Sequence, residues 1–190
     1  MVPRATCRSG FTIVELLVVT MVVAVLIGIA MPHVDVARHR VENAVRETAS
    51  TLAAARYRAA VLQHDVIVSF DAAARRITVH EDQNNDGAIQ PNEPVRSIEL
   101  PEGIIFGRGS APVGPPGSVV IGFRSGSYGL PHVTFHRNGS ASESEGLYLT
   151  STASASNSKF AHHTRALTVE RATGRVTTFR YESGGWRRVH

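Results

Sequence analysis

The sequence contains almost no cysteine. Its 190 residues include one, Cys7, and a disulfide within the chain needs two. The folded protein must therefore be held together by its hydrophobic core rather than by cross-links. A composition with 43% hydrophobic and 19% charged residues is typical of a globular body, and the length allows one domain with an additional segment.

Signatures of known catalytic sites are also missing. The sequence has no His-Glu-x-x-His motif, no Gly-x-Ser-x-Gly elbow and no glycine-rich phosphate loop. His132 and His136 would share one face of a strand, and His162 and His163 are adjacent. Without cysteine ligands we interpret both pairs as surface histidines rather than as zinc sites. The sequence therefore favours a protein that is not an enzyme.

Charges are missing from one long stretch. Between Phe11 and Met31 the only ionisable side chain is Glu15. At about 1.5 Å per residue, roughly 20 apolar residues span the ~30 Å hydrocarbon core of a membrane, so residues 11–31 are predicted to form a transmembrane helix. A carboxylate in lipid costs about 2.5–3.5 kcal/mol and needs a partner. No Lys or Arg lies in the stretch, so we expect the partner of Glu15 on another molecule.

A small residue, Gly10, precedes this stretch. In a secretory signal the cleavage site follows the apolar region, whereas here the small residue stands before it. Cleavage after Gly10 would retain the apolar helix and give Phe11 a free amino group, which a neighbouring copy could offer to Glu15 as a cation. The complete motif is Gly10-Phe11-Thr12-Ile13-Val14-Glu15-Leu16.

This motif, followed by Pro32, resembles the prepilin N-terminal motif of type IV pilins and type II secretion pseudopilins. The resemblance implies that a prepilin peptidase cleaves after Gly10, that Phe11 is then N-methylated, and that Glu15 orders assembly with other pilin or pseudopilin subunits. Loss of residues 1–10 removes two arginines and no acid, which lowers the formal net charge from +4 to +2. The net charge is then a weak argument for a nucleic-acid partner.

The helix is predicted to resume after a kink at Pro32 and to continue to residue 62. Small or apolar residues recur there at intervals of three and four, which is typical of an amphipathic helix. Arginine and glutamate residues lie between them and are interpreted as a solvated face. The predicted inner face consists of Ala37, Val41, Ala44, Val45, Thr48, Leu52, Ala55, Ala59 and Leu62.

Beyond residue 62 the pattern alternates in the manner of β-strands. Two stretches rich in small residues, 108–118 and 151–158, are predicted to be mobile surface loops. The fold class is therefore α+β, with a long N-terminal helix packed on an antiparallel sheet. Strands are predicted at residues 66–70, 77–80, 95–100, 104–106, 119–123, 133–135, 147–150, 166–170 and 175–181.

The second half of the body permits a finer comparison. Residues 135–141, 147–149, 166–169 and 173–176 resemble the C-terminal half of the GspH and FimT group of minor pseudopilins, in which an Asn-Gly or Asp-Gly turn precedes a final hairpin closed by Thr-Gly-Arg. The resemblance implies a type IV pilin-like fold and a structural subunit of a type II secretion pseudopilus. The alternative is a minor type IV pilin of FimT type that takes part in DNA uptake or surface binding.

The expected organisation follows from these resemblances. Residues 1–10 are a leader peptide, 11–31 a single transmembrane helix in the bacterial inner membrane, 32–62 its amphipathic continuation, and 63–190 a periplasmic β-rich domain. The expected partners are prepilin peptidase, other pseudopilins or pilins through the N-terminal helix, and inner-membrane lipid. DNA is a less favoured partner.

One loop suggests a cofactor, Ca²⁺. Residues 82–93 have oxygen-bearing side chains at positions 1, 3 and 5, glycine at position 6 and glutamate at position 12, which fits the twelve-residue Ca²⁺ loop. Strands rather than helices are expected on both sides, so an ordinary polar connector is the alternative. The predicted ligands are the side chains of Asp82, Asn84, Asp86 and Glu93 and the carbonyl of Ala88, with Gly87 at the turn.

A basic C-terminal segment is the candidate DNA site. Arginines alternate there with Phe179, Tyr181 and Trp186, and such a mixture can contact phosphates and stack on bases. The favoured interpretation is instead an edge hairpin with solvated arginines. The candidate DNA-binding residues are Arg175, Arg180, Arg187 and Arg188.

Overall fold

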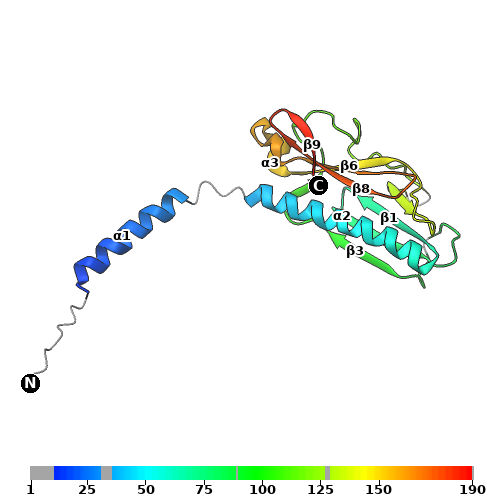
Figure 1. Ribbon diagram of the computed structural model, residues 1–190, viewed down its shortest axis with the longest axis horizontal. Coiled ribbons are helices and arrows are strands. Elements are labelled where there is room, and N and C mark those ends of the chain that lie inside the picture. Colours follow the sequence, from blue (N-terminus) through cyan, green and yellow to red (C-terminus); the bar gives the residue numbers. More distant parts are fainter. Residues whose placement is uncertain (1–10, 31–35, 89, 127–128, 190) are drawn as a thin grey trace, which may run out of the picture. The chain divides into compact units, whose positions relative to one another are not determined.

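The computed structural model describes residues 11–30, 36–88, 90–126 and 129–189. The chain forms two compact units, residues 1–36 and residues 37–190. Gly10 and Pro32 lie outside the described residues, so the predicted cleavage site and the predicted kink do too. Each unit is described by itself (Figure 1).

The first unit contains one described helix, α1, over Ile13–Ala30. Its described large apolar side chains are between 47% and 86% exposed. Among the described residues, no helix combines the length and the apolarity that a membrane span requires.

The second unit begins with α2, over Val36–Leu62. The predicted inner face is confirmed at seven of its nine positions, which are spaced by three and four residues as a single helix face requires. Ala37 is half-buried and Leu62 is exposed, because they lie at the two ends of the helix. The seven buried residues are Val41, Ala44, Val45, Thr48, Leu52, Ala55 and Ala59.

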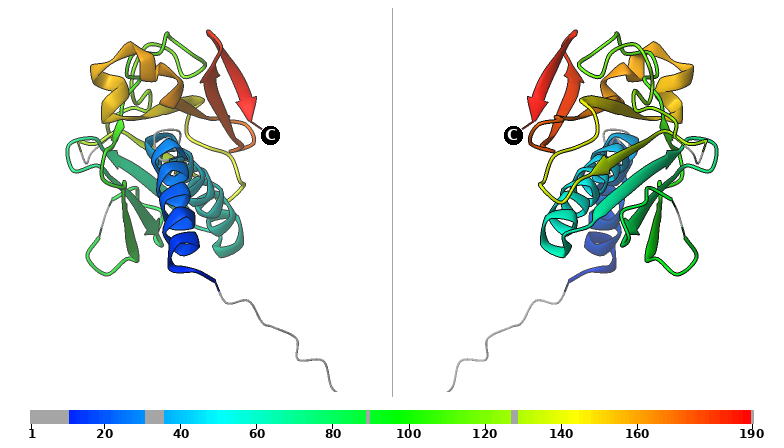
Figure 2. Two further views of the ribbon diagram at one scale, coloured as in Figure 1. Left: turned by 90° about the vertical axis from the view of Figure 1, so that its left-hand side faces the viewer. Right: turned by 90° about the vertical axis from the view of Figure 1, so that its right-hand side faces the viewer.

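The second unit also contains two antiparallel sheets, and α2 lies along them (Figures 1 and 2). The first sheet has the order β3-β2-β1-β5 and the second the order β4-β6-β7-β8-β9. In chain order the strands are β1 Asp65–Asp71, β2 Arg76–Asp82, β3 Val95–Glu99, β4 Ile104–Phe106, β5 His132–Phe135, β6 Glu145–Ser151, β7 Arg165–Val169, β8 Val176–Glu182 and β9 Gly185–Val189. The α+β class is as expected.

One hydrophobic core joins α2 to both sheets. Leu52 of α2, Phe70 of β1 and Leu147 of β6 are all fully buried in the same cluster. Phe70 stacks on Phe123 at 5.3 Å between ring centroids. Every residue of this cluster lies between positions 41 and 176, so the second unit holds its complete core and does not need the first unit in order to fold.

Three predictions of secondary structure in this unit are wrong. Residues 119–123 form an isolated bridge, Ile121 to Leu147, instead of a strand. β4 already pairs with Leu149–Ser151 on the edge of β6 that residues 119–123 approach. Residues 119–123 therefore meet only the beginning of β6. The two backbone hydrogen bonds between them run from Gly122 N to Gly146 O and from Tyr148 N to Val120 O.

The second wrong prediction concerns residues 151–158. Instead of a loop they contain the helix α3, Thr152–Ser156, and the start of the 3₁₀ helix η2, Ser158–His163. Ser151 caps α3 by accepting from the N–H of Ser154 at 3.2 Å, and Asn157 caps η2 by accepting from the N–H of Lys159 at 2.9 Å.

The third concerns the C-terminus. The Thr173–Gly174 turn joins β7 to β8 as expected, with φ of 60° at Gly174. However, this is not the final hairpin, because β8 pairs with a further strand, β9, after a turn at Ser183 and Gly184. Both turn residues have positive φ, as a two-residue hairpin turn requires.

Candidate functional sites

The N-terminus of α1 carries the first candidate site. The helix begins at Ile13, and Thr12 accepts a hydrogen bond from the N–H of Glu15 at 3.2 Å through its Oγ1 atom. Thr12 is therefore the N-cap and Glu15 is the third helical residue, the position that glutamate takes in a capping box. A carboxylate at this position also interacts favourably with the helix dipole. Glu15 thus has a local role that the sequence prediction did not include.

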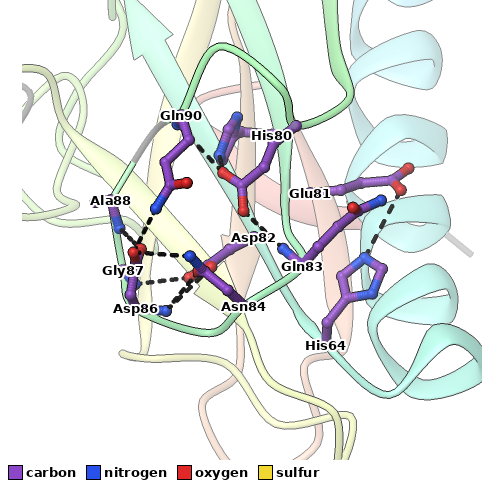
Figure 3. Close-up of polar contacts among 11 residues, drawn as sticks. His64, His80, Glu81, Asp82, Gln83, Asn84, Asp86, Gly87, Ala88 and Gln90 are labelled. Carbon is purple, nitrogen blue, oxygen red and sulfur yellow. Dashed lines mark hydrogen bonds and ion pairs between the residues drawn. The ribbon is translucent and has the colours of Figure 1, made fainter.

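The loop after β2 is the second candidate site. Both oxygens of the buried Asp82 accept backbone N–H groups, from Asp86 at 3.1 Å and from Gly87 at 2.7 Å. Asn84 accepts from the N–H of Asp86 at 3.1 Å, and Gly87 has a φ of 72°. Figure 3 shows the side chains of Asp82, Asn84 and Asp86 gathered inside the turn. The sharp turn at Gly87 is therefore present.

The carboxylate of Asp86 is held by its neighbours. The N–H of Ala88 donates to its Oδ1 atom at 2.7 Å, and the side chains of Asn84 and Gln90 donate to Oδ2. The pKa of Asp86 is lowered, first by the hydrogen bond from the Ala88 N–H, against an opposing effect of burial, and further by Asn84 and Gln90.

Glu93 closes the loop from the inside. Its side chain is 2% exposed, and its Oε2 atom lies 2.8 Å from Nε2 of His80, which is also buried. The N–H groups of Gln83 and Gln90 donate to the same carboxylate at 2.9 and 3.2 Å. Burial acts to raise the pKa of Glu93, but the hydrogen bonds from His80, Gln90 and Gln83 outweigh it, so the pKa is lowered.

The geometry of this loop does not test whether it binds Ca²⁺. The oxygens of Asp82, Asn84 and Asp86 are close together, but the carboxylate of Glu93 is engaged with His80. Across the described ranges, no group of three or more His, Cys, Asp or Glu residues is placed to hold a metal ion. Ca²⁺ binding therefore stays a prediction, and Glu93 would have to exchange His80 for the ion.

The His80–Glu93 pair was missed from the sequence. The pairing of β2 with β3 places His80 opposite Val95. The loop between these strands brings the carboxylate of Glu93 to the Nε2 atom of His80. On the other side of β2, Glu81 forms an ion pair with Arg58 of α2 at 2.7 Å. Nδ1 of His80 is buried without a hydrogen-bond partner among the described residues. The alternation of β2 could have shown that His80 and Glu81 face opposite sides, but not which residues they meet.

The four candidate DNA-binding arginines do not form one surface. Arg180 lies opposite Arg187 in the hairpin of β8 and β9, whereas Arg188 lies opposite Phe179, so Arg187 and Arg188 are on opposite faces. Arg180 is paired with Glu182 at 3.1 Å. Arg175 precedes β8 and is exposed.

The ring of Trp186 in this hairpin contacts two tyrosine rings. The rings of Tyr181 and Tyr148 each lie 5.6 Å from that of Trp186, on centroid distances. The indole N–H of Trp186 donates to the carbonyl of Pro112 at 3.3 Å. These contacts leave less of each ring available to stack on bases, and DNA binding stays a prediction.

The four histidines considered from the sequence have different surroundings. Nδ1 of His136 lies 2.8 Å from Oδ2 of Asp65, and His132 and His162 are half-buried. His163 is 1% exposed and its Nδ1 lies 2.8 Å from Oγ of Ser151. The prediction of a surface histidine is therefore wrong for His163, because η2 turns its ring into the interior.

Comparisons with known proteins were made with the sequence and with the structure. No protein-family profile matches the sequence, and no curated protein matches it. The structure is similar to that of the minor pseudopilin EpsH from the type 2 secretion system of Vibrio cholerae, at 13% sequence identity and a TM-score of 0.39. The match covers 79% of this chain and 96% of that chain. A TM-score of this size is too low to establish a shared fold.

Proposed function

We propose that this protein is a minor pseudopilin, a structural subunit of a type II secretion pseudopilus and not an enzyme. The observation that carries the proposal is the motif at residues 10–16, which leads directly into the apolar helix α1 with Glu15 in its first turn. Residues 11–31 would lie in the inner membrane, and the second unit would be exposed to the periplasm.

The exposure of α1 supports a role in assembly. A helix whose apolar side chains are at least 47% exposed needs a covering that its own unit does not supply. Membrane lipid would cover it before assembly, and the helices of other pseudopilins would cover it afterwards. In both surroundings Glu15 would lie in a medium of low polarity, where an isolated carboxylate is unfavourable.

Cleavage after Gly10 would supply the partner of Glu15. The amino group of Phe11 from a neighbouring subunit would form an ion pair with this carboxylate, and such a pair selects the register of the packed helices. The competing explanation is local, because Glu15 is the third residue of α1, the position from which a glutamate side chain can bond to the N–H of the N-cap residue in a capping box. The two explanations predict different results for Glu15→Gln, since glutamine also serves in a capping box but carries no charge.

The first experiment tests processing. The full chain is produced in a bacterium together with a prepilin peptidase, and its N-terminus is analysed by mass spectrometry. We expect loss of residues 1–10 and one methyl group on Phe11. A chain that keeps residues 1–10 in the presence of an active peptidase, under conditions in which a known prepilin is cleaved, would refute the proposal.

The second experiment tests assembly with matched variants of Glu15. Glu15→Val and Glu15→Gln should both be cleaved, and both should fail to co-purify with pseudopili from cells that express the other pseudopilins. Normal incorporation of Glu15→Gln together with failure of Glu15→Val would assign the residue to helix capping. Normal incorporation of both would remove the carboxylate from the assembly mechanism.

The alternative is a minor type IV pilin that binds DNA through Arg175, Arg180, Arg187 and Arg188. The ion pair of Arg180 and the ring contacts of Trp186 argue against it. A gel shift with the second unit at low salt separates the two, because phosphate contacts strengthen as the salt concentration falls. We expect no shift, and a shift that weakens with salt would favour the DNA-binding function.

A further inference from the structure

A groove runs between α2 and the second sheet. It has a volume of about 530 Å³, which is within the range of known binding pockets, roughly 300–1,000 Å³. Small and apolar residues, among them Ala49, Ala53 and Val176, contribute to its lining. The remaining lining residues are Arg56, Gly174, Arg175, Thr177, Thr178, Arg188 and Val189.

The charge of this groove is of one sign. Three arginines line it, Arg56, Arg175 and Arg188, and no acidic residue does. Other arginines of the unit are neutralised, for example Arg165 by Glu42 at 2.9 Å. Among the described residues, the three groove arginines have no acidic partner within ion-pair distance.

Arg56 is held in place by two turns. Its Nε atom donates to the carbonyl of Gly139 at 3.1 Å. Gly174 packs against the same side chain, since a Cβ atom at that position would lie 2.9 Å from Cδ of Arg56 and 2.5 Å from the Gly139 carbonyl. The hydrogen bond and this packing restrict the side chain of Arg56 before any ligand arrives, which lowers the entropy lost on binding.

We infer that this groove binds an acidic segment of a partner protein. Carboxylates would pair with Arg56, Arg175 and Arg188, and small apolar side chains would contact Ala49 and Ala53. Nucleic acid fits less well, because no aromatic residue on which a base could stack is among the residues that line the groove. The inference does not depend on the proposed role in secretion.

The test uses residues 36–190, which contain the complete core. The probe is a fluorescent five-residue peptide that alternates glutamate and valine, and its control has glutamine in place of glutamate. We expect saturable binding of the acidic peptide by fluorescence anisotropy, weakened by salt, and no binding of the control. Absence of saturable binding at millimolar protein concentration would overturn the inference.

Substitutions locate the binding. Arg56→Gln and Arg188→Gln should each weaken binding by about fivefold, the upper end of what one exposed ion pair contributes. Arg187→Gln is the matched control, because Arg187 is exposed in the same strand but does not line the groove, and it should change the affinity by less than about twofold. Equal losses in all three variants would show a general charge effect and overturn the inference. Urea unfolding followed by Trp186 fluorescence checks that Arg56→Gln is folded.

Other occupants give different results. Binding of a 20-base-pair duplex more tightly than the peptide, with loss in Arg56→Gln, would assign the groove to nucleic acid. Self-association in sedimentation that Arg56→Gln abolishes would assign it to a second copy of this chain. Either result would overturn the acidic-peptide inference.

Discussion

The two long helices of this chain differ in the exposure of their apolar residues. α1 exposes its described large apolar side chains by 47% or more, whereas α2 places seven residues in the core of its own unit. The partner of α2 is encoded in the same chain. The surface of α1 must be covered by something else, and this difference separates the part of the sequence that determines the fold from the part that we propose determines assembly.

Glu93 and Glu15 differ in the same way as the two helices. Glu93 is buried, and its carboxylate accepts from His80 and from two backbone N–H groups. Glu15 lies on an exposed apolar helix, and the bond described at that residue involves its backbone N–H. A satisfied carboxylate belongs to the structure of its unit, whereas one placed on an otherwise apolar surface calls for a partner from outside.

A matched pair of truncations, one in each helix, tests whether only α2 contributes to the stability of the second unit. Leu52→Ala removes a fully buried side chain of α2, and Leu17→Ala removes one of α1 that is 61% exposed. Leu52→Ala should lower the free energy of unfolding by about 3 kcal/mol, as cavities in cores do. Leu17→Ala should change it by less than about 0.5 kcal/mol. Urea unfolding of the full chain in detergent, followed by Trp186 fluorescence, measures both.

Similar losses from the two leucine truncations would contradict this account. They would mean that α1 contributes to the stability of the second unit, and that the division between fold and assembly does not hold.

The next largest effect is expected at a buried ion pair. Nε of Arg165, a side chain 2% exposed, donates to Glu42 at 2.9 Å. Glu42→Gln leaves a buried cation without its counter-charge, which should cost about 2–3 kcal/mol because one partner of the pair remains partly exposed to water. Glu47→Gln, on the exposed side of the same helix, is the control and should cost less than about 0.5 kcal/mol. Thermal and urea unfolding of both variants give the comparison.

Much of this division is visible in the sequence, because periodicity is a local property. The intervals from Val41 to Ala59 predict the buried face of α2, and alternation predicts the strands β1 and β2. The polar contacts are not local. Arg165 and Glu42 are 123 positions apart, and no periodic pattern connects them. The same holds for Arg56 and the carbonyl of Gly139, which are 83 positions apart.

The missed elements have other physical causes. β9 follows a Ser-Gly turn and contains two adjacent arginines, one on each face of the strand. Its sequence therefore lacks the alternation of apolar and polar residues by which a strand is predicted. α3 is built from Ser, Thr and Ala, residues that also occur in loops, and its cap is formed by a serine that could equally end a strand. In the candidate sites, the sharp turn at Gly87 was predictable from the loop motif, but the choice of His80 as the partner of Glu93 depends on the register of β2 and β3.

The buried glutamate can be examined through pH. The pKa of Glu93 is below its ordinary value of 4.5 in the folded protein, so the unfolded chain takes up this proton more readily than the folded one. The ionised carboxylate of Glu93 contributes its full stabilisation when the pH is above 4.5, the ordinary pKa. This contribution is lost as the pH falls from 4.5 through the lower pKa of the folded protein. Glu93→Gln should therefore lower stability near pH 7 and reduce the slope of unfolding free energy against pH below 4.5.

Calcium gives the smallest expected effect. To become a ligand, Glu93 must leave His80 and two backbone N–H groups, so binding should be weak. We expect 1 mM CaCl₂ to raise the free energy of unfolding of residues 36–190 by less than about 1.4 kcal/mol, the value reached at roughly ten times the dissociation constant. MgCl₂ at equal ionic strength is the control, and Asp82→Ala should abolish any difference between the two ions. A larger and calcium-specific rise would show that this loop exchanges its histidine for an ion, and Glu93 would then resemble Glu15, for which we propose a partner from outside the chain.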